Sequence, residues 1–317
     1  INICDMPIAI IDVVAAAMGI QNKKEIVYDY FGLNHFGWFT KVRLNGEDVT
    51  EKLKSYVAEH GYMPQNAKSD VLHSDPSWLH TYANAKNICS AFHDYLPNTY
   101  MQYYLLGDEV VKSSDPNHTR ANEVMEGREK RIFDAVADYR AGKDVDLTKF
   151  FGGVHGEFIV DVAMSLAFDL RKRYLVMVEN NGAVENLPSD AMVEIPAYIT
   201  DRGPEPVRVG EIPTFYKGLI EQQEAVEKLI VDAAVEHSYE KALMAFTLSK
   251  TVPSLLVAKK ILDDMIVANN LKVAGAGFGT DTNVVTMIRE NKETELPIMS
   301  KEEVAGAILD EIFEIKR

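Results

Sequence analysis

The residue types that could carry chemistry gather near the start of the chain. Cys4 and Asp5 stand side by side where a short apolar run gives way to a helical pattern that extends from Ile8 to Met18. The N-terminus of a helix favours the thiolate form of a cysteine. His35 lies in a second apolar run further along. A thiolate and an imidazole would make half of a metal site, with water or substrate oxygens as the remaining ligands.

Each of these residues also has a structural interpretation. Asp5 is a plausible N-cap, with Pro7 near the first helical position, and Gly19 would end that helix. An isolated cysteine is more often buried and inert, and a lone histidine in a strand more often has a structural role. The local pattern leaves both interpretations open.

The second apolar run predicts the element that would hold His35. Residues 25–44 alternate aromatic, β-branched and polar types, and Asn45-Gly46 is a strong hairpin-turn dipeptide. The pattern predicts an antiparallel sheet that carries Asn34 and His35 near its middle. Gly32 and Gly37 on either side indicate a bulge or the close approach of a ligand.

Two later segments contain further candidates. Residues 96–104 are rich in tyrosine, which usually indicates packing. Residues 117–123 form a polar cluster at the start of a helix, where the guanidinium of Arg120 and the backbone N–H groups could bind an anion. The alternative there is a capped helix with a solvated arginine.

The remaining patterns decide the fold class. Helical patterns cover residues 48–92, 123–140, 155–172 and 213–258, with breaks at prolines, and residues 174–179 form an apolar strand. Residues 191–199 and 207–212 predict a second hairpin. Antiparallel signals without a βαβ alternation predict an α+β fold.

Composition excludes several classes of function. With 47% hydrophobic and 26% charged residues, the 317-residue chain has the balance of a soluble globular protein. A net charge of −15 disfavours nucleic acids and anionic membranes as partners, so an anionic substrate would need locally placed cations. No apolar run is long enough for a transmembrane helix. Two cysteines form no disulfide framework, which predicts a cytoplasmic protein.

Several motifs, in this order, resemble glycoside hydrolase family 4 and, within it, its 6-phospho-α-glucosidases. The resemblance covers residue 1 to about residue 262, and Cys-Asp-Met-Pro is the form of the cysteine motif typical of the phospho-α branch. The motifs are Asn2–Pro7, Gly32–Trp38, Leu96–Tyr100, Asn117–Glu129, Val178–Gly182, Gly203–Pro206 and Leu248–Pro253.

The resemblance implies a domain like the C-terminal domain of lactate dehydrogenase and a mechanism unlike ordinary two-carboxylate hydrolysis. NAD oxidises the sugar at C3, the C2 proton becomes acidic, the glycosidic oxygen leaves, water adds and the ketone is reduced again. A divalent metal, Mn²⁺ in the family, polarises the C2 and C3 oxygens.

The resemblance also implies a role for each matching residue. Cys4 and His35 would be the metal ligands. Asp5 would be the general acid and Tyr100 the base at C2. Arg120 would bind the sugar phosphate. Asn2 and Asn34 would contact the substrate, a phosphorylated disaccharide of the maltose 6′-phosphate type. The resemblance and the long C-terminal helices together favour a homodimer or homotetramer.

The chain departs from the family at both ends. The family's NAD-binding Rossmann half should precede residue 1, so we expect this chain to lack most of the NAD site and assign no cofactor-binding residue. Residues 263–317 resemble instead the end of the phosphopantothenoylcysteine synthetase domain. We therefore expect two domains, 1–262 and 263–317, the second being a strand–loop–strand–helix tail whose final helix starts from Ser300. The alternative to a glycosidase is an inactive remnant or an assembly partner without catalysis.

Overall fold

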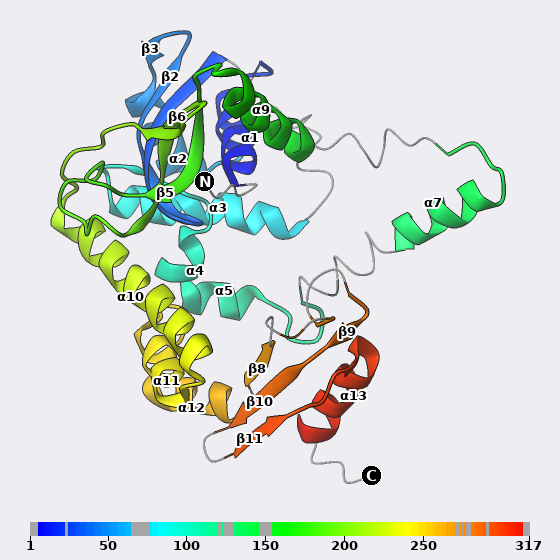
Figure 1. Ribbon diagram of the computed structural model, residues 1–317. Coiled ribbons are helices and arrows are strands. Elements are labelled where there is room, and N and C mark those ends of the chain that lie inside the picture. The colour runs from blue at the N-terminus through cyan, green and yellow to red at the C-terminus, as the bar shows by residue number, and fades with distance from the viewer. Residues whose placement is uncertain are drawn as a thin grey trace. The chain divides into compact units, whose positions relative to one another are not determined.

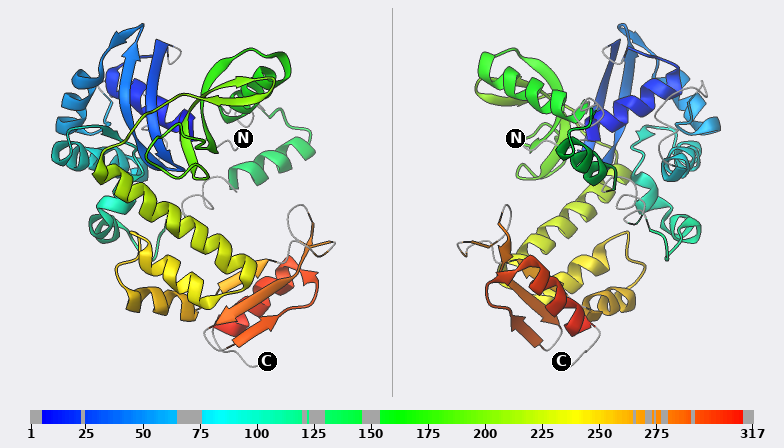
Figure 2. Two further views of the ribbon diagram at one scale, coloured as in Figure 1. Left: turned by 60° about the vertical axis from the view of Figure 1, so that its left-hand side comes forward. Right: turned by 90° about the vertical axis from the view of Figure 1, so that its right-hand side faces the viewer.

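The computed structural model describes residues 6–22, 25–64, 76–119, 122, 130–145, 154–264, 266–269, 273, 275–276, 280–289 and 292–312. The chain divides into two compact units, residues 1–220 and residues 221–317. Strands pair antiparallel in every described sheet, and helices are mixed with them along the chain, as Figures 1 and 2 show. The predicted α+β class is confirmed.

The first unit contains most of the elements. Its helices are α1 (Met6–Met18), α2 (Thr50–His60), α3 (Pro76–Ala91), α4 (Met101–Leu105), α5 (Gly107–Ser113), α7 (Lys130–Arg140), α9 (Val154–Phe168) and the start of α10 (Thr214–Glu236). Its strands are β1 (Ile26–Leu33), β2 (Phe36–Leu44), β3 (Glu47–Asp48), β4 (Leu96–Pro97), β5 (Lys172–Glu179), β6 (Met192–Thr200) and β7 (Gly203–Pro206).

Strand β2 lies at the centre of the first sheet, where it pairs with β1, β3 and β4. The turn to β3 is Asn45-Gly46, with φ angles of 51° and 86°. Positive φ at both central residues is the geometry for which Asn-Gly is preferred in two-residue hairpins. The predicted turn is therefore confirmed.

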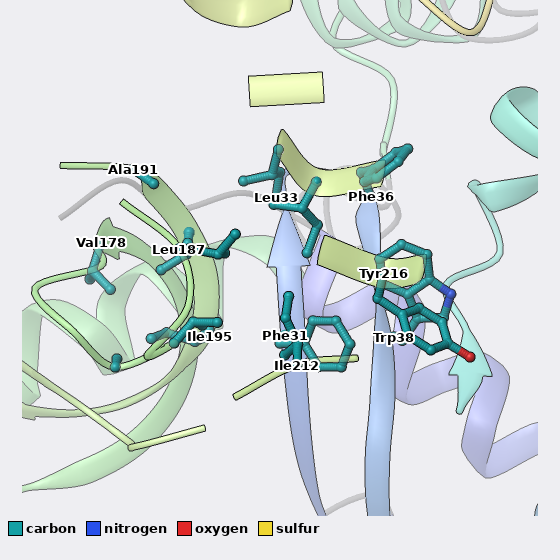
Figure 3. Close-up of a cluster of buried hydrophobic side chains, with 14 of the residues drawn as sticks. Phe31, Leu33, Phe36, Trp38, Val178, Leu187, Ala191, Ile195, Ile212 and Tyr216 are labelled. Carbon is teal, nitrogen blue, oxygen red and sulfur yellow. The ribbon is translucent and has the colours of Figure 1, made fainter. Parts of the chain in front are cut away.

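The β1–β2 hairpin is buried on both faces. One face carries Phe31, Leu33, Phe36 and Trp38, which join a hydrophobic cluster with side chains of β5, β6 and α10, as the close-up in Figure 3 shows. The opposite face carries Tyr30, Phe39 and Val42 and packs against α1, α2 and α3. Burial on both faces explains why the predicted alternation breaks down at Tyr30-Phe31 and at Trp38-Phe39, where consecutive side chains are buried.

The second sheet, β5-β6-β7, contains the other predicted hairpin in shortened form. Strand β6 turns at Asp201 and Arg202 and returns as β7, which ends at Pro206. The prediction of a strand over residues 207–212 is wrong. Val209 and Gly210 donate backbone hydrogen bonds to Ala183 O, and Ile212 donates to the Asn186 side chain, so this segment is bound to a loop.

Helices of the first unit follow the sequence closely. Helix α1 ends at Met18, and Gly19 follows with φ 69°, as the glycine signal predicted. Helix α9 ends earlier than expected, and β5 begins at Lys172. Of the helix predicted over residues 123–140, the structure describes α7, and residues 123–129 lie outside the described ranges.

The second unit holds the rest of α10 and a small α/β segment. Its elements are α11 (Tyr239–Leu248), α12 (Leu255–Asp264), β8 (Ile266–Asn269), β9 (Thr282–Asn283), β10 (Val285–Arg289), β11 (Lys292–Glu295), β12 (Met299–Ser300) and α13 (Lys301–Ile312). A sheet in the order β11-β10-β8 and a β12-β9 pair precede α13.

Helix α13 begins at the position that the sequence predicted. Ser300 Oγ accepts a hydrogen bond from the Glu303 N–H, and the Glu303 carboxylate accepts one from the Ser300 N–H. This reciprocal pair satisfies backbone donors that a helix N-terminus leaves open. Among the described residues, no helix combines the length and the apolar character that a membrane span requires.

Candidate functional site

Asn34 and His35 form the turn that closes the β1–β2 hairpin. Leu33 at the end of β1 pairs with Phe36 at the start of β2, which leaves two residues between the strands. His35 has φ 61°, a left-handed conformation that costs about 1–2 kcal/mol for a residue with a side chain. The prediction that His35 lies within a strand is therefore wrong. His35 is instead a turn residue at the end of the hairpin.

Two paired glycines lie directly behind this turn. Gly32 and Gly37 face each other across the hairpin. A Cβ atom on Gly37 would lie 2.5 Å from the Tyr30 hydroxyl oxygen and 2.6 Å from the Phe31 carbonyl oxygen. The glycines thus permit a close approach, while the ligand that the sequence indicated there stays a prediction. Within the described structure the approaching group is the protein's own Tyr30 hydroxyl.

Strand β4 brings Tyr100 to His35. Pro97 pairs with Trp38, and the Asn98 N–H donates a 2.9 Å hydrogen bond to the Gly37 carbonyl oxygen. The Tyr100 and His35 ring centroids lie 4.8 Å apart with the planes inclined by 57°. Two residues predicted to act on one substrate are therefore in contact.

Asn34 contributes an oxygen to the same turn. Its side-chain Oδ1 atom is buried and, within the described structure, accepts no hydrogen bond. A buried acceptor without a donor costs about 1–3 kcal/mol. A sugar hydroxyl is a donor of the kind that would satisfy it. The predicted role of Asn34 as a substrate contact is compatible with this position.

Four predicted site residues lie outside the described ranges: Asn2, Cys4, Asp5 and Arg120. Helix α1 begins at Met6, the residue after Asp5. Thr119, the residue before Arg120, donates hydrogen bonds from its N–H and its hydroxyl to Asn122 Oδ1. The described residues include no group of three or more His, Cys, Asp or Glu side chains placed to hold a metal ion. The metal site of Cys4 and His35 therefore stays a prediction, because Cys4 lies outside the described ranges.

Glu194 contacts this turn and is not among the residues predicted from the sequence. This residue of β6 is 1% exposed, and its carboxyl accepts hydrogen bonds from the Tyr30 hydroxyl and the His35 backbone N–H. Burial raises the pKa of Glu194 to about 8, although the two hydrogen bonds act to lower it. The available signal was a glutamate inside the apolar strand Val193-Glu194-Ile195.

Cys89, the second cysteine of the chain, is buried in α3. Cys89 of α3 is 1% exposed, and its Sγ lies 3.5 Å from the Lys54 carbonyl oxygen. Burial raises the pKa of this thiol above its usual value. A buried thiol with a raised pKa is unreactive, so Cys89 is a structural residue.

Comparison with known proteins finds two families in the chain. Residues 30–252 match the family 4 glycosyl hydrolase C-terminal domain. Residues 222–315 match the DNA/pantothenate metabolism flavoprotein C-terminal domain. The two matches overlap at residues 222–252, upstream of the division predicted at residue 263.

Individual relatives agree with the first match. The maltose-6′-phosphate glucosidase of Bacillus subtilis (strain 168) is 46% identical over 270 residues, 85% of this chain and 60% of that protein. A crystal structure of a 6-phospho-alpha-glucosidase from gut microorganisms, in complex with NAD and glucose-6-phosphate, is 60% identical with a TM-score of 0.79. The alignment covers 83% of this chain and 59% of that one.

A second solved structure comes from the same group of enzymes. This 6-phospho-alpha-glucosidase from gut microorganisms, in complex with NAD and Mn²⁺, is 40% identical with a TM-score of 0.74. The alignment covers 83% of this chain and 58% of that one. The chain thus spans about three fifths of the length of the relatives that it matches.

Proposed function

The chain belongs to the family 4 glycosyl hydrolases, through their C-terminal domain, and we propose that it supplies the substrate- and metal-binding part of a 6-phospho-α-glucosidase. The observation that carries the proposal is the contact between His35 and Tyr100, whose ring centroids lie 4.8 Å apart. The named activities of the relatives support the substrate class. The activity proposed is that of the whole protein, of which this chain spans a part.

We assign the metal to Cys4 and His35. A thiolate and an imidazole bind a divalent cation and leave positions open for oxygen ligands from the sugar. Bound Mn²⁺ supplies a Lewis acid next to the sugar oxygens. His35 is suited to the task because it lies in the turn that closes a hairpin buried on both faces, where its ring contacts Tyr100.

Tyr100 then removes the proton at the sugar C2, and Asp5 protonates the departing glycosidic oxygen. Bound NAD supplies the reversible oxidation at the neighbouring carbon that makes the C2 proton acidic. Arg120 binds the 6-phosphate. A protein with a net charge of −15 needs such a local cation to attract an anionic sugar. Asn34 accepts a hydrogen bond from a sugar hydroxyl through its buried Oδ1, and Asn2 makes a further substrate contact.

The test is release of 4-nitrophenol from 4-nitrophenyl 6-phospho-α-glucoside with Mn²⁺ and NAD. The chain is assayed alone and together with a separately expressed N-terminal segment of the Bacillus subtilis relative that this chain does not cover. We expect turnover in the combined sample and its loss on chelation. A combined sample that binds Mn²⁺ but releases no nitrophenol would favour the inactive remnant or assembly partner.

We further propose that residues 263–317 have no activity of their own and that the chain forms a homodimer or homotetramer. The described tail contains short strands and one final helix, and the family that it matches extends over residues 222–315. Light scattering of the purified chain tests the assembly. Release of residues 263–317 by limited proteolysis, leaving the rest folded, tests the division.

A further inference from the structure

A buried chain of polar groups links the backbone of His35 to the backbone of Tyr100. We propose that its members Glu194, Tyr30 and Asn98 are positioning residues that set how the His35 imidazole and the Tyr100 ring face each other. The proposal rests on the proposed function, because it assumes that these two rings meet one substrate. Glu194, Tyr30 and Asn98 are not among the site residues that the family resemblance implies.

The first link is the carboxyl of Glu194. It accepts the backbone N–H of His35, the residue with φ 61° in the turn. Among the described residues no lysine or arginine forms an ion pair with Glu194, and its Oε2 atom accepts no hydrogen bond. A buried carboxyl without an ion-pair partner is costly to a fold, so its presence calls for a role other than stability. Anchoring a strained turn is such a role.

The second link is the hydroxyl of Tyr30. It donates to the Glu194 carboxyl and accepts a 3.0 Å hydrogen bond from Asn98 Nδ2. The Tyr30 side chain is 1% exposed, and the absence of a side chain at Gly37 makes the space that its hydroxyl occupies. Donor, acceptor and steric neighbour together fix this oxygen in one place.

The third link is Asn98, which is also 1% exposed. Its Oδ1 accepts a 2.9 Å hydrogen bond from the Tyr100 N–H while its Nδ2 donates to Tyr30. Both ends of the amide are therefore used, and a rotation of the side chain would break both bonds. The backbone N–H of Asn98 is held by Gly37 O, on the strand that starts after His35.

Buried polar networks often serve only to specify a fold. This network differs because it begins on the backbone of one proposed site residue and ends on that of another. A change of about 1 Å in such a pair can cost about 10²-fold in rate, and loss of outer-shell support typically costs 10–100-fold in metal affinity. A positioning role therefore predicts a local change at His35 that a loss of stability alone would not cause.

The experiment compares Tyr30→Phe with Tyr62→Phe. Both tyrosines are 1% exposed, and the Tyr62 hydroxyl also bonds to this segment, at 2.8 Å from Pro97 O, but lies outside the network. Histidine labelled with ¹³C reports the His35 ring by NMR, assigned by its loss in His35→Asn. Tyr100→Ala gives the signal without the neighbouring ring. Mn²⁺ affinity is measured by electron paramagnetic resonance, and thermal unfolding monitors stability.

We expect Tyr30→Phe to move the His35 signal toward its Tyr100→Ala position and to weaken Mn²⁺ binding about 10-fold. Tyr62→Phe should lower the unfolding temperature by about as much as Tyr30→Phe does. Its His35 signal and its Mn²⁺ affinity should stay at the wild-type values. An unmoved His35 signal in Tyr30→Phe, or an equal movement in both variants, would overturn the proposal.

A second pair covers the case in which Tyr30→Phe does not fold. Glu194→Gln retains a side-chain carbonyl that can accept the His35 N–H, whereas Glu194→Ala does not. The His35 signal should stay near its wild-type position in the first variant and move in the second, and equal positions would refute the role. The signal is measured without Mn²⁺ or substrate. If the wild-type chain neither binds Mn²⁺ nor hydrolyses the glucoside, the proposed function fails while this inference can still be tested.

Discussion

Strand β2 has a two-residue turn at each end, and the two turns are built in opposite ways. Asn45-Gly46 is exposed, has positive φ at both residues, and leaves open space around Gly46. Asn34-His35 has a histidine at φ 61°, a buried asparagine oxygen and crowded glycines behind it. The exposed turn satisfies local preferences. The other departs from them, and the contacts that hold it come from Tyr100, at the start of α4, and from Glu194 of β6.

Strain of this kind persists where surrounding structure determines it, and it concentrates at functional sites. In the proposed function the two turns have different duties: one joins strands, and the other presents an imidazole. Each of the following changes should affect the two turns unequally.

The largest expected effect follows from removing one hydroxyl beside the buried turn. Tyr100→Phe in the reconstituted enzyme should lower kcat at least 100-fold, about 3 kcal/mol, because the proposed base is lost. Mn²⁺ affinity should remain. Tyr103→Phe is the matched control, since its ring lies 5.7 Å from that of Tyr100 and is partly exposed. An unchanged kcat in Tyr100→Phe would refute the assignment of the base.

Replacing a glycine by alanine should lower the free energy of unfolding by different amounts at the two turns. Gly37→Ala places a methyl group 2.5 Å from the Tyr30 hydroxyl oxygen and should destabilise the chain by about 3 kcal/mol. Gly46→Ala meets no atom within 4 Å and pays only for its φ of 86°, about 1 kcal/mol. Urea unfolding measures both, and equal losses would contradict the contrast.

The buried turn should also respond to pH through Glu194. Its pKa is about 8 in the folded chain, against an ordinary value of 4.5. Between these values the folded state keeps a proton that the unfolded state has released. Stability therefore falls as pH rises from about 4.5 to about 8, with a slope of at most about 1.4 kcal/mol per pH unit from this group.

Glu194→Gln removes the carboxyl that binds this proton. Measured without added metal, its free energy of unfolding should depend less steeply on pH than that of the wild type over the same window. The exposed turn provides the control, because Asn45→Gly retains Glu194 and should keep the wild-type slope. Parallel curves for Glu194→Gln and the wild type would show that Glu194 is ionised in the folded chain.

The smallest effect concerns the strained histidine itself. His35→Gly relieves the left-handed conformation but gives up chain entropy and the ring contact with Tyr100, so stability should change by no more than about 1 kcal/mol. Asn45→Gly should change it by a few tenths. Only His35→Gly should abolish the rise in unfolding temperature on addition of Mn²⁺. A rise that persists would remove His35 from the metal site.

The sequence by itself determined the features that depend on near neighbours. Examples are the end of α1 before Gly19, the Asn45-Gly46 turn and the start of α13 after Ser300. The motifs also identified the family, since residues 30–252 match its C-terminal domain. In each case the deciding interaction spans a few residues or the pattern is specific in its own right.

Only the tertiary structure decided how the site residues are held. The Asn98–Tyr30 hydrogen bond joins residues 68 positions apart, and Glu194 reaches the His35 turn from β6. Local preference allows a histidine at φ 61° only at a cost and does not favour a glutamate between Val193 and Ile195. Such positions become favourable only once distant strands have packed, because the donors that satisfy them come from elsewhere in the fold.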